Sequence, residues 1–279
     1  DKARAAVSAT AIGVAALRAI ESRKPPEERL VHDPLAEVLV GPERLKLDWW
    51  ENTGLSKEFW VDFLAARTRW IDDRLTAEAA ALPEFQLVVV GAGLDTRAYR
   101  LEGLRGKQVF ELDFPEVLDA KRTILSEGSA PAEPFSHRVA VPADLSSGEN
   151  WRGALLGAGF LSEQPSVWLL EGLTGYLTEE ELERLFADLS ELAAAGSRMI
   201  ATFVGRGMRT NVTPMHRYMI SDGGQASSLL MKHGWQADEV PRIKSIADRY
   251  GRGGNIPEGY EYYIAEAVRC PVASRSSPL

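Results

Sequence analysis

The stretch VVVGAGLDTRAYRL, residues 88–101, decides the fold of this 279-residue chain. A run of β-branched valines, which favours a strand, meets Gly91 and Gly93 and then passes into a helix-like segment. A glycine turn of this kind lets the backbone approach a ligand closely and leaves helix N–H groups free to bind oxygen atoms. The stretch therefore predicts the first strand and turn of a ligand-binding α/β sheet.

After residue 83, short apolar runs alternate with helical stretches. The pattern predicts helices at 115–125 and 179–195, and strands at 86–90, 108–112, 135–141, 166–170, 198–204 and 260–268. Strands that alternate with helices form parallel βαβ units with right-handed crossovers. We therefore expect a doubly wound α/β sheet, which binds its ligand outside the carboxyl ends of the strands.

The sequence up to about residue 82 reads as helix. Asp33 followed by Pro34 is typical of a helix N-cap with proline at the first helical position, and residues 57–81 carry apolar side chains at helical spacing. The uncharged stretch 5–17 is shorter than the roughly 20 residues of a membrane span. Its small residues and its continuation through Arg18 favour a packing helix over a signal peptide, so we expect a cytoplasmic protein.

Charge and cysteine content argue against several classes of protein. A net charge of −8 opposes nucleic-acid binding, which needs clustered Lys and Arg. The single cysteine, Cys270, excludes an intramolecular disulfide and a cysteine-based zinc site, and it fits a reducing compartment. We expect no nucleic acid, membrane or metal as a partner, and the sequence does not indicate an oligomeric state.

The glycine turn alone does not identify the ligand. The dinucleotide fingerprint G-x-G-x-x-G fails at its third glycine, where this chain has Thr96. Asp113 lies 20 positions after Gly93 and ends the second strand, where an acid can bind ribose hydroxyls. Glu111 is a weaker candidate for the same role. The alternative is that both acids cap the helix that begins near residue 115.

Two more acids follow the third and fourth strands. Asp144 could accept a hydrogen bond from an adenine amino group beside the Leu145 backbone, or it could be an ordinary helix N-cap. Glu171 directly follows the apolar run at 166–170, where a buried carboxylate is costly unless it has a partner. A cationic group of the ligand is one possible partner.

Three successive strands therefore end in an acid on the ligand-binding edge of the sheet. This pattern suits a ligand with hydroxyls, an exocyclic amine and a positive charge, which describes S-adenosylmethionine better than a doubly anionic pyrophosphate. Arg67, on the helix before the first strand, is a candidate for the ligand carboxylate, with a solvated helix face as the alternative. Asp95 and Arg97 are expected to fix the shape of the loop.

With these motifs in order, the chain resembles the leucine carboxyl methyltransferase family, which also contains bacterial O-methyltransferases of natural-product pathways. The resemblance covers about 8–205, with a final strand at 260–268. The matching motifs are AARTR (65–69), GAGLDTRAYRL (91–101), ELDFPEVLDAKR (111–122), ADL (143–145) and PSVWLLEGLTGYLTEEE (165–181).

The resemblance implies a class I methyltransferase (Rossmann-like) fold. This is a mostly parallel seven-stranded sheet whose last strand is antiparallel. We expect one compact unit with an N-terminal helical cap at 1–82 and an α/β core at 83–279. The core would include a lid insertion at 204–256, and S-adenosylmethionine would be the cofactor.

The resemblance also implies a role for each matching residue. Gly91 would lie beneath the methionine part of the cofactor, in the turn that it shares with Gly93. The polar contacts would be Arg67 to the cofactor carboxylate, Asp113 to the ribose, Asp144 and Leu145 to the adenine, and Glu171 to the amino group. The segment 8–22 matches the bacterial branch, and it has no counterpart of a lysine found in the phosphatase-modifying branch. A phosphatase C-terminus is therefore not the expected substrate.

The methyl acceptor is predicted to be a carboxylate of a small molecule or peptide. A carboxylate is already ionised near neutral pH and needs no general base, whereas a phenolic or alcoholic hydroxyl, the alternative acceptor, would benefit from one. His216 and His233 are candidate bases, and Tyr176 could orient the acceptor oxygen or pack in the core.

The insertion also bears on the acceptor. It carries eight Lys or Arg against four acids. This surplus of positive charge favours an anionic acceptor. The alternative is that these residues form a solvated helical face. Trp49, Trp50 and Trp60 would line an apolar pocket or belong to the core. A nicotinamide-dependent oxidoreductase and a non-catalytic cofactor-binding protein remain as alternatives from other classes.

Overall fold

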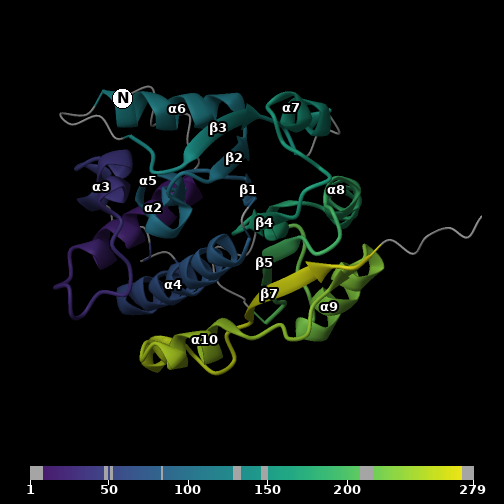
Figure 1. The fold of residues 1–279 in the computed structure, drawn as a ribbon. Coiled ribbons are helices and arrows are strands. Elements are labelled where there is room, and N and C mark those ends of the chain that lie inside the picture. Colours follow the sequence, from purple (N-terminus) through teal and green to yellow (C-terminus); the bar gives the residue numbers. More distant parts are fainter. Residues whose placement is uncertain are drawn as a thin grey trace, which may run out of the picture.

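The computed structural model describes residues 9–46, 50, 53–82, 84–127, 133–145, 150–207 and 216–271. Trp49 lies outside these ranges. Within them, a seven-stranded sheet in the order β3-β2-β1-β4-β5-β7-β6 runs through the centre of the molecule (Figure 1). Its strands are β1 (Gln86–Val90), β2 (Gln108–Asp113), β3 (His137–Pro142), β4 (Ser166–Leu170), β5 (Arg198–Val204), β6 (Trp235–Gln236) and β7 (Tyr262–Arg269).

The directions of the strands confirm the predicted topology. Strands β1 to β5 pair in parallel, and β7 is antiparallel to both of its neighbours, β5 and β6. The strand order reverses at β1, which lies between β2 and β4. Ligands of doubly wound sheets bind at such a reversal. Gly91 and Glu171, which follow β1 and β4, are therefore next to each other at the expected position.

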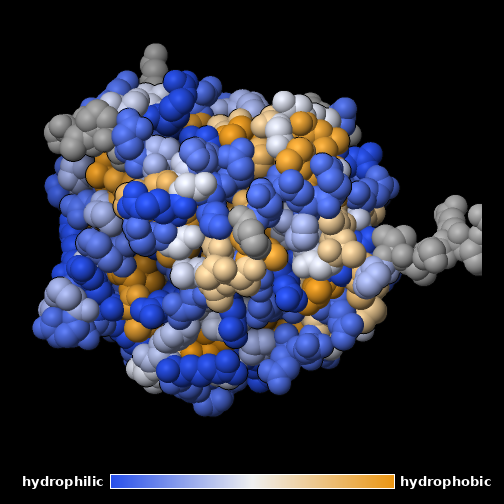
Figure 2. All heavy atoms as spheres, in the orientation of Figure 1, coloured by the Kyte–Doolittle hydropathy of each residue, from blue (hydrophilic) through white to orange (hydrophobic). Residues whose placement is uncertain are grey.

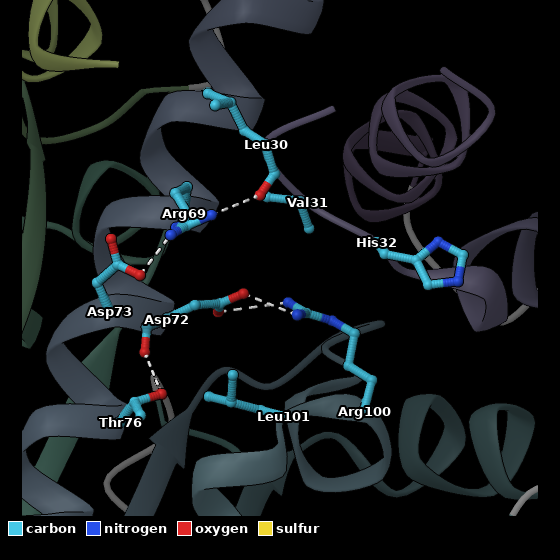
Figure 3. Close-up of a pocket in the computed structure, with 9 residues that line it drawn as sticks. All are labelled: Leu30, Val31, His32, Arg69, Asp72, Asp73, Thr76, Arg100 and Leu101. Atoms are coloured by element: carbon cyan, nitrogen blue, oxygen red, sulfur yellow. Dashed lines mark hydrogen bonds and ion pairs between the residues drawn. The ribbon is translucent and has the colours of Figure 1, made fainter. Parts of the chain in front are cut away.

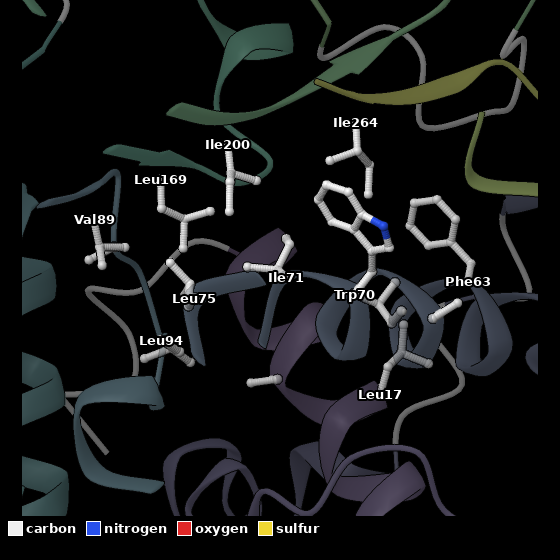
Figure 4. Packing of buried hydrophobic residues seen from close by; sticks show 14 of the residues in the cluster. Leu17, Phe63, Trp70, Ile71, Leu75, Val89, Leu94, Leu169, Ile200 and Ile264 are labelled. Atoms are coloured by element: carbon white, nitrogen blue, oxygen red, sulfur yellow. The ribbon is translucent and has the colours of Figure 1, made fainter. Parts of the chain in front are cut away.

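The N-terminal helices are α2 (Ala9–Ser22), α3 (Pro34–Val40) and α4 (Lys57–Ala81). The Asp33 side chain accepts a hydrogen bond from the Ala36 backbone, 3.1 Å away, so Asp33 caps α3 as predicted. Helix α4 packs its apolar face on the sheet. Figure 4 shows Trp70 and Ile71 of this helix beside strand residues such as Ile264.

The remaining helices cover both faces of the sheet. They are α5 (Arg97–Arg100), α6 (Pro115–Ser126), α7 (Trp151–Gly157), α8 (Glu179–Leu192), α9 (Gly223–Lys232) and α10 (Ile243–Arg249). Successive residues of a strand point to opposite faces. Accordingly, Leu169 joins the core beneath α4, whereas Trp168 joins the core beneath α7 to α9. Burial on both faces explains why β4 is apolar at nearly every position.

The predicted insertion at 204–256 divides between two places in the fold. Strand β6 extends the sheet beside β7, and helix α9 packs against these two strands. Helix α10 packs against α4, with Ile243 and Ile246 fully buried. Whether this segment covers a bound substrate stays a prediction.

Figure 2 shows a face that is mostly hydrophilic, with smaller apolar patches. No helix in the described ranges combines the length and the apolar character that crossing a membrane requires.

Candidate functional site

The turn after β1 depends on both of its glycines. The backbone N–H groups of Gly91 and Ala92 both donate to the Leu112 carbonyl at 2.9 Å, which ties the turn to the end of β2. Gly91 and Gly93 have φ values of 72° and 47°, a region that favours glycine. A Cβ atom at Gly91 would lie 3.1 Å from Leu173 Cδ1. The turn therefore brings bare backbone close to the loop after β4.

Asp113 closes the other side of this turn. Its Oδ2 accepts the Gly93 N–H at 2.7 Å, and its Oδ1 accepts the Phe114 N–H at 2.7 Å. Burial raises the pKa of Asp113, although these two backbone donors oppose the rise. The N-cap of α6 is Phe114, without a side-chain capping bond, so Asp113 does not have the capping role considered for it. Its carboxylate is fixed at the ligand-binding edge.

Glu111, the weaker ribose candidate, lies in a different environment. Its Oε2 is 2.7 Å from Lys121 Nζ and 2.7 Å from a terminal guanidinium nitrogen of Arg138. Glu111 and Lys121 are 1% and 0% exposed. These buried ion pairs give Glu111 a structural role.

Asp144 and Leu145 lie beside Asp113, as the strand order predicts. The Ala143 N–H donates to the Asp113 carbonyl at 2.9 Å, which holds the end of β3 against the end of β2. Leu145 is buried and Asp144 is half-buried. The ends of β2 and β3 thus present two acids to the same edge of the sheet.

Glu171 contacts two arginines from different helices. Its Oε1 is 2.7 Å from Arg67 Nε on α4, and its Oε2 is 2.7 Å from Arg97 Nη1 on α5. Burial alone raises the pKa of this carboxyl, but the guanidinium groups of Arg97 and Arg67 outweigh it and lower the pKa to about 2. This acid, whose side chain is 14% exposed, thus has its partners inside the protein. Arg67 also donates to the Tyr262 hydroxyl at 3.0 Å.

These contacts belong to a larger cluster, which we call the buried charge network. Asp72 accepts Arg97 Nε at 2.6 Å and Arg100 Nη1 at 2.7 Å, and Asp95 pairs with Arg97. Asp33 accepts Arg18 Nε at 2.8 Å and lies 3.7 Å from Arg100. The network has four positive and four negative members and so carries no net charge: Arg18, Arg67, Arg97 and Arg100 with Asp33, Asp72, Asp95 and Glu171.

Asp72 and Arg100 also line a small surface cleft of about 180 Å³ (Figure 3). The cleft lies between α4, the segment before α3 and the end of α5, and its polar side chains are largely paired with one another, as in the bonds of Arg69 to Asp73 and to the Leu30 carbonyl. None of the predicted cofactor residues lines it. We therefore place the candidate site at the glycine turn and not in this cleft.

Tyr176 and His216, predicted separately as acceptor-site residues, are neighbours. Tyr176 ends the short 3-10 helix η4 (Thr174–Tyr176) after β4, and its ring centroid lies 5.5 Å from that of His216. A Cβ atom at Gly175 would lie 2.9 Å from His216 Cδ2, so glycine makes room for the imidazole. Burial lowers the pKa of His216, and its Nδ1 is buried without a hydrogen-bond partner among the described residues.

Other sequence candidates have structural surroundings. His233 lies 2.6 Å from Glu183 on α8, apart from His216. Trp50 and Trp60 are buried in the core beneath α4. Many of the basic residues in the insertion are in ion pairs, which weakens the argument for an anionic acceptor: Arg217 with Glu181, Lys232 with Glu183, Lys244 with Asp248 and Arg252 with Asp62.

The sequence did not point to three contributors to the site. Arg97 was expected only to shape the loop, and it does bond to Asp95, but it also holds Glu171. Asp72 carried no signal beyond its place on a helix, and Tyr262 none beyond its place in a strand. Their roles depend on contacts between elements far apart in the chain. For Arg67 and Glu171 the separation is 104 residues.

Known proteins resemble this chain over most of its length. The model of the leucine carboxyl methyltransferase family matches residues 11–190. A relative from Mycobacteroides abscessus is 42% identical over 204 residues, which span 69% of this chain and 64% of that relative. One from Parafrankia is 36% identical and covers 86% of this chain and 80% of its own length. Both carry the provisional name S-adenosyl-L-methionine-dependent methyltransferase.

Solved structures share the fold at low sequence identity. A duf574 family protein from Streptomyces avermitilis aligns with a TM-score of 0.59 and 15% identity, over 92% of this chain and 97% of that one. A provisionally named methyltransferase from Thermobifida fusca gives a TM-score of 0.56 and 15% identity, over 95% and 96%. With a family model that matches well over half of its residues, the chain belongs to the leucine carboxyl methyltransferase family of S-adenosylmethionine-dependent methyltransferases.

Proposed function

We propose that this protein transfers a methyl group from S-adenosylmethionine to an oxygen atom, forming a methyl ester on a carboxylate of a small-molecule or peptide natural product. The observation that supports the cofactor in this proposal is the Arg67–Glu171 pair at the point where the strand order reverses. A guanidinium beside a carboxylate is complementary to the carboxylate and ammonium of an α-amino acid, which is one end of this cofactor.

The other residues at the edge fit the rest of the cofactor. The bare backbone at Gly91 and Gly93 leaves room for its methionine part. The Asp113 carboxylate would accept the ribose hydroxyls, and Asp144 with Leu145 would contact the adenine. Asp113 and Asp144 present carboxylates where a doubly anionic pyrophosphate would be repelled, so the residues at this edge favour this cofactor over a dinucleotide.

When bound, the cofactor supplies a methyl group that is activated by its positively charged sulfur. The protein must hold an acceptor oxygen in line with that methyl group and keep water away. A carboxylate is ionised near neutral pH and needs no proton removal. A carboxylate acceptor is also supported by the family of this chain, which is named for carboxyl methyltransferases.

A second candidate, methylation of a phenolic or alcoholic hydroxyl, is favoured by the Tyr176–His216 pair. A phenol has a pKa of about 10 and benefits from a base that removes its proton. The lowered pKa of His216 favours a neutral imidazole, and its buried Nδ1 has no hydrogen-bond partner among the described residues, so it could accept a proton from a substrate bound beside it. Tyr176 would then orient the acceptor oxygen.

Calorimetry tests the cofactor assignment. Wild-type protein should bind S-adenosylmethionine and its product S-adenosylhomocysteine, but not NAD⁺. Glu171→Gln should weaken S-adenosylhomocysteine binding by roughly 10- to 100-fold, because it removes a charged hydrogen-bond acceptor. It should leave the binding of methylthioadenosine, which lacks the amino-acid end, unchanged. Equal affinity of the variant and wild type for S-adenosylhomocysteine would contradict the placement of Glu171.

The acceptor class is tested with a methyl-labelled cofactor. The enzyme is incubated with a panel of carboxylic acids and with matched phenols whose carboxyl is blocked as an amide. Label in a carboxylate product should be released by mild base, because esters hydrolyse there and aryl ethers do not. His216→Asn should leave ester formation intact. A base-stable product whose formation is lost in this variant would decide for the hydroxyl acceptor.

A further inference from the structure

Glu171 is held by two arginines whose surroundings differ. Arg67 contacts one acid, Glu171, in the described structure. Its guanidinium carbon Cζ lies 5.5 Å from the ring centroid of Phe63 and 5.7 Å from that of Tyr262. Arg97 contacts three acids: Glu171, Asp72 and Asp95. Arg67 can therefore leave Glu171 without stranding another acid, whereas Arg97 cannot.

The aromatic side of Arg67 lowers the cost of such a change. Aromatic faces stabilise a nearby cation, and the Tyr262 hydroxyl accepts from Nη1 at 3.0 Å. These contacts do not involve Glu171. If a ligand carboxylate replaces Glu171 as the partner of Arg67, the guanidinium keeps its other neighbours.

The balance of charge points in the same direction. The buried charge network has equal numbers of positive and negative members. A zwitterionic ligand adds one charge of each sign and preserves this balance. A ligand with only one of the two charges leaves an uncompensated charge in a buried site, which is strongly unfavourable.

We infer that Arg97 is a positioning residue: it holds the Glu171 carboxylate in place for the ligand's ammonium group while Arg67 exchanges Glu171 for the ligand's carboxylate. This inference rests on the proposed function. Beyond that function, we infer that the Arg67–Glu171 ion pair breaks when the ligand binds. Arg97 acts through Glu171 and does not contact the cofactor. This arrangement also makes the site selective for a zwitterionic amino-acid end.

Two arginines on α5 provide a matched pair of variants. Arg97 and Arg100 have side chains that are 3% and 9% exposed, lie one helical turn apart and both bond to Asp72. Of the two, only Arg97 bonds to Glu171. Lysine keeps the charge but is a point charge on a flexible stem and cannot reproduce the arginine fork. Arg97→Lys tests the inference, and Arg100→Lys controls for loss of a buried arginine.

The measurement is the ratio of affinities for S-adenosylhomocysteine and methylthioadenosine, each by calorimetry. In Arg97→Lys the affinity for S-adenosylhomocysteine should fall by about tenfold or more, from the loss of a charged hydrogen bond to Glu171, and methylthioadenosine binding should not change. Arg100→Lys should leave the ratio of the two affinities within about twofold of wild type, because Arg100 bonds to Asp72 and not to Glu171. An equal loss for both ligands in Arg97→Lys would show a purely structural role and overturn the inference.

Ligand analogues test the exchange in the wild-type protein, whatever the stability of the variants. S-adenosylhomocysteine lacking only its amino group, or only its carboxyl group, should bind no more tightly than methylthioadenosine, because each brings one uncompensated charge. Near-native affinity of either analogue would overturn the inference. If S-adenosylhomocysteine itself failed to bind wild-type protein, the proposed function would fail instead.

Discussion

At the scale of single residues, Glu171 shows how a carboxylate is tolerated after a fully buried strand. The sequence indicated that such an acid needs a partner and suggested the ligand. The structure supplies Arg67 and Arg97 as partners within the protein. The acid is therefore ionised before any ligand arrives, and its contribution to stability depends on pH.

The direction of this dependence follows from the pKa. In the folded protein the pKa of Glu171 is about 2, below the ordinary value of 4.5. The stabilisation is therefore complete above about pH 4.5 and is lost as the pH falls towards 2. Its size is on the order of 3 kcal/mol.

Urea unfolding between pH 6 and pH 3 measures this contribution. In Glu171→Gln the free energy of unfolding should fall less steeply with decreasing pH than in wild type. Glu102→Gln, at an exposed ion pair, serves as the control and should keep the wild-type slope. Parallel slopes for wild type and Glu171→Gln would contradict the assigned pKa.

At the scale of elements, the N-terminus of helix α8 is specified by a capping motif in its local sequence. The Thr178 side chain accepts the Glu181 N–H at 3.2 Å, and the Glu181 side chain accepts the Thr178 N–H at 2.8 Å, which is a capping box. Thr178→Ala should destabilise the protein by about 1 kcal/mol, whereas Thr178→Ser should retain most of the stability. Urea unfolding of both variants checks this. Equal loss in both would mean that the hydroxyl is not what stabilises the helix start.

Strands and helices were predictable where one local signal was strong. The apolar runs of β1 and β4 are confirmed at 86–90 and 166–170, because burial on both faces makes these strands continuously apolar. Helix α8 ends at Leu192, three residues before the predicted end. Strand β6 was missed: it has only two residues, Trp235 and Gln236, and β7 is the one strand that it pairs with in the described sheet.

The candidate site was predictable in part for the same reason. Parallel strands place their carboxyl ends on one edge, so Asp113, Asp144 and Glu171 could be assigned to that edge from strand order alone. Which basic residues face them depends on how α4 and α5 cross the sheet. Arg97 and Glu171 are separated by 74 residues, and no local pattern encodes that contact.

At the scale of the whole molecule, the N-terminal helices are joined to the glycine turn. A Cβ atom at Gly93 would lie 3.7 Å from the Ala11 side chain of α2. Arg18, also on α2, donates to the Leu94 carbonyl at 2.6 Å and pairs with the fully buried Asp33. The N-terminal helices are thus continuous with the glycine turn at the edge of the sheet.

Arg18→Gln tests this connection. The change leaves Asp33 with a weaker set of partners and should cost about 2 kcal/mol, with faster amide hydrogen exchange in α2 than in wild type. Arg23→Gln removes an exposed pair with Glu37 in the same region and should change little. Uniformly faster exchange throughout the protein, β1 and β4 included, would contradict a local connection.

The position of β7 has a consequence for how the protein is made. This strand follows β6 in the chain but lies between β5 and β6 in the sheet. Until β7 pairs with it, β5 therefore has an unpaired edge over its whole length, and such edges can recruit other chains. We therefore expect nascent chains that end between β5 and β7 to be more prone to aggregation than the finished protein. The sheet is complete only once β7, which ends at Arg269, pairs between β5 and β6.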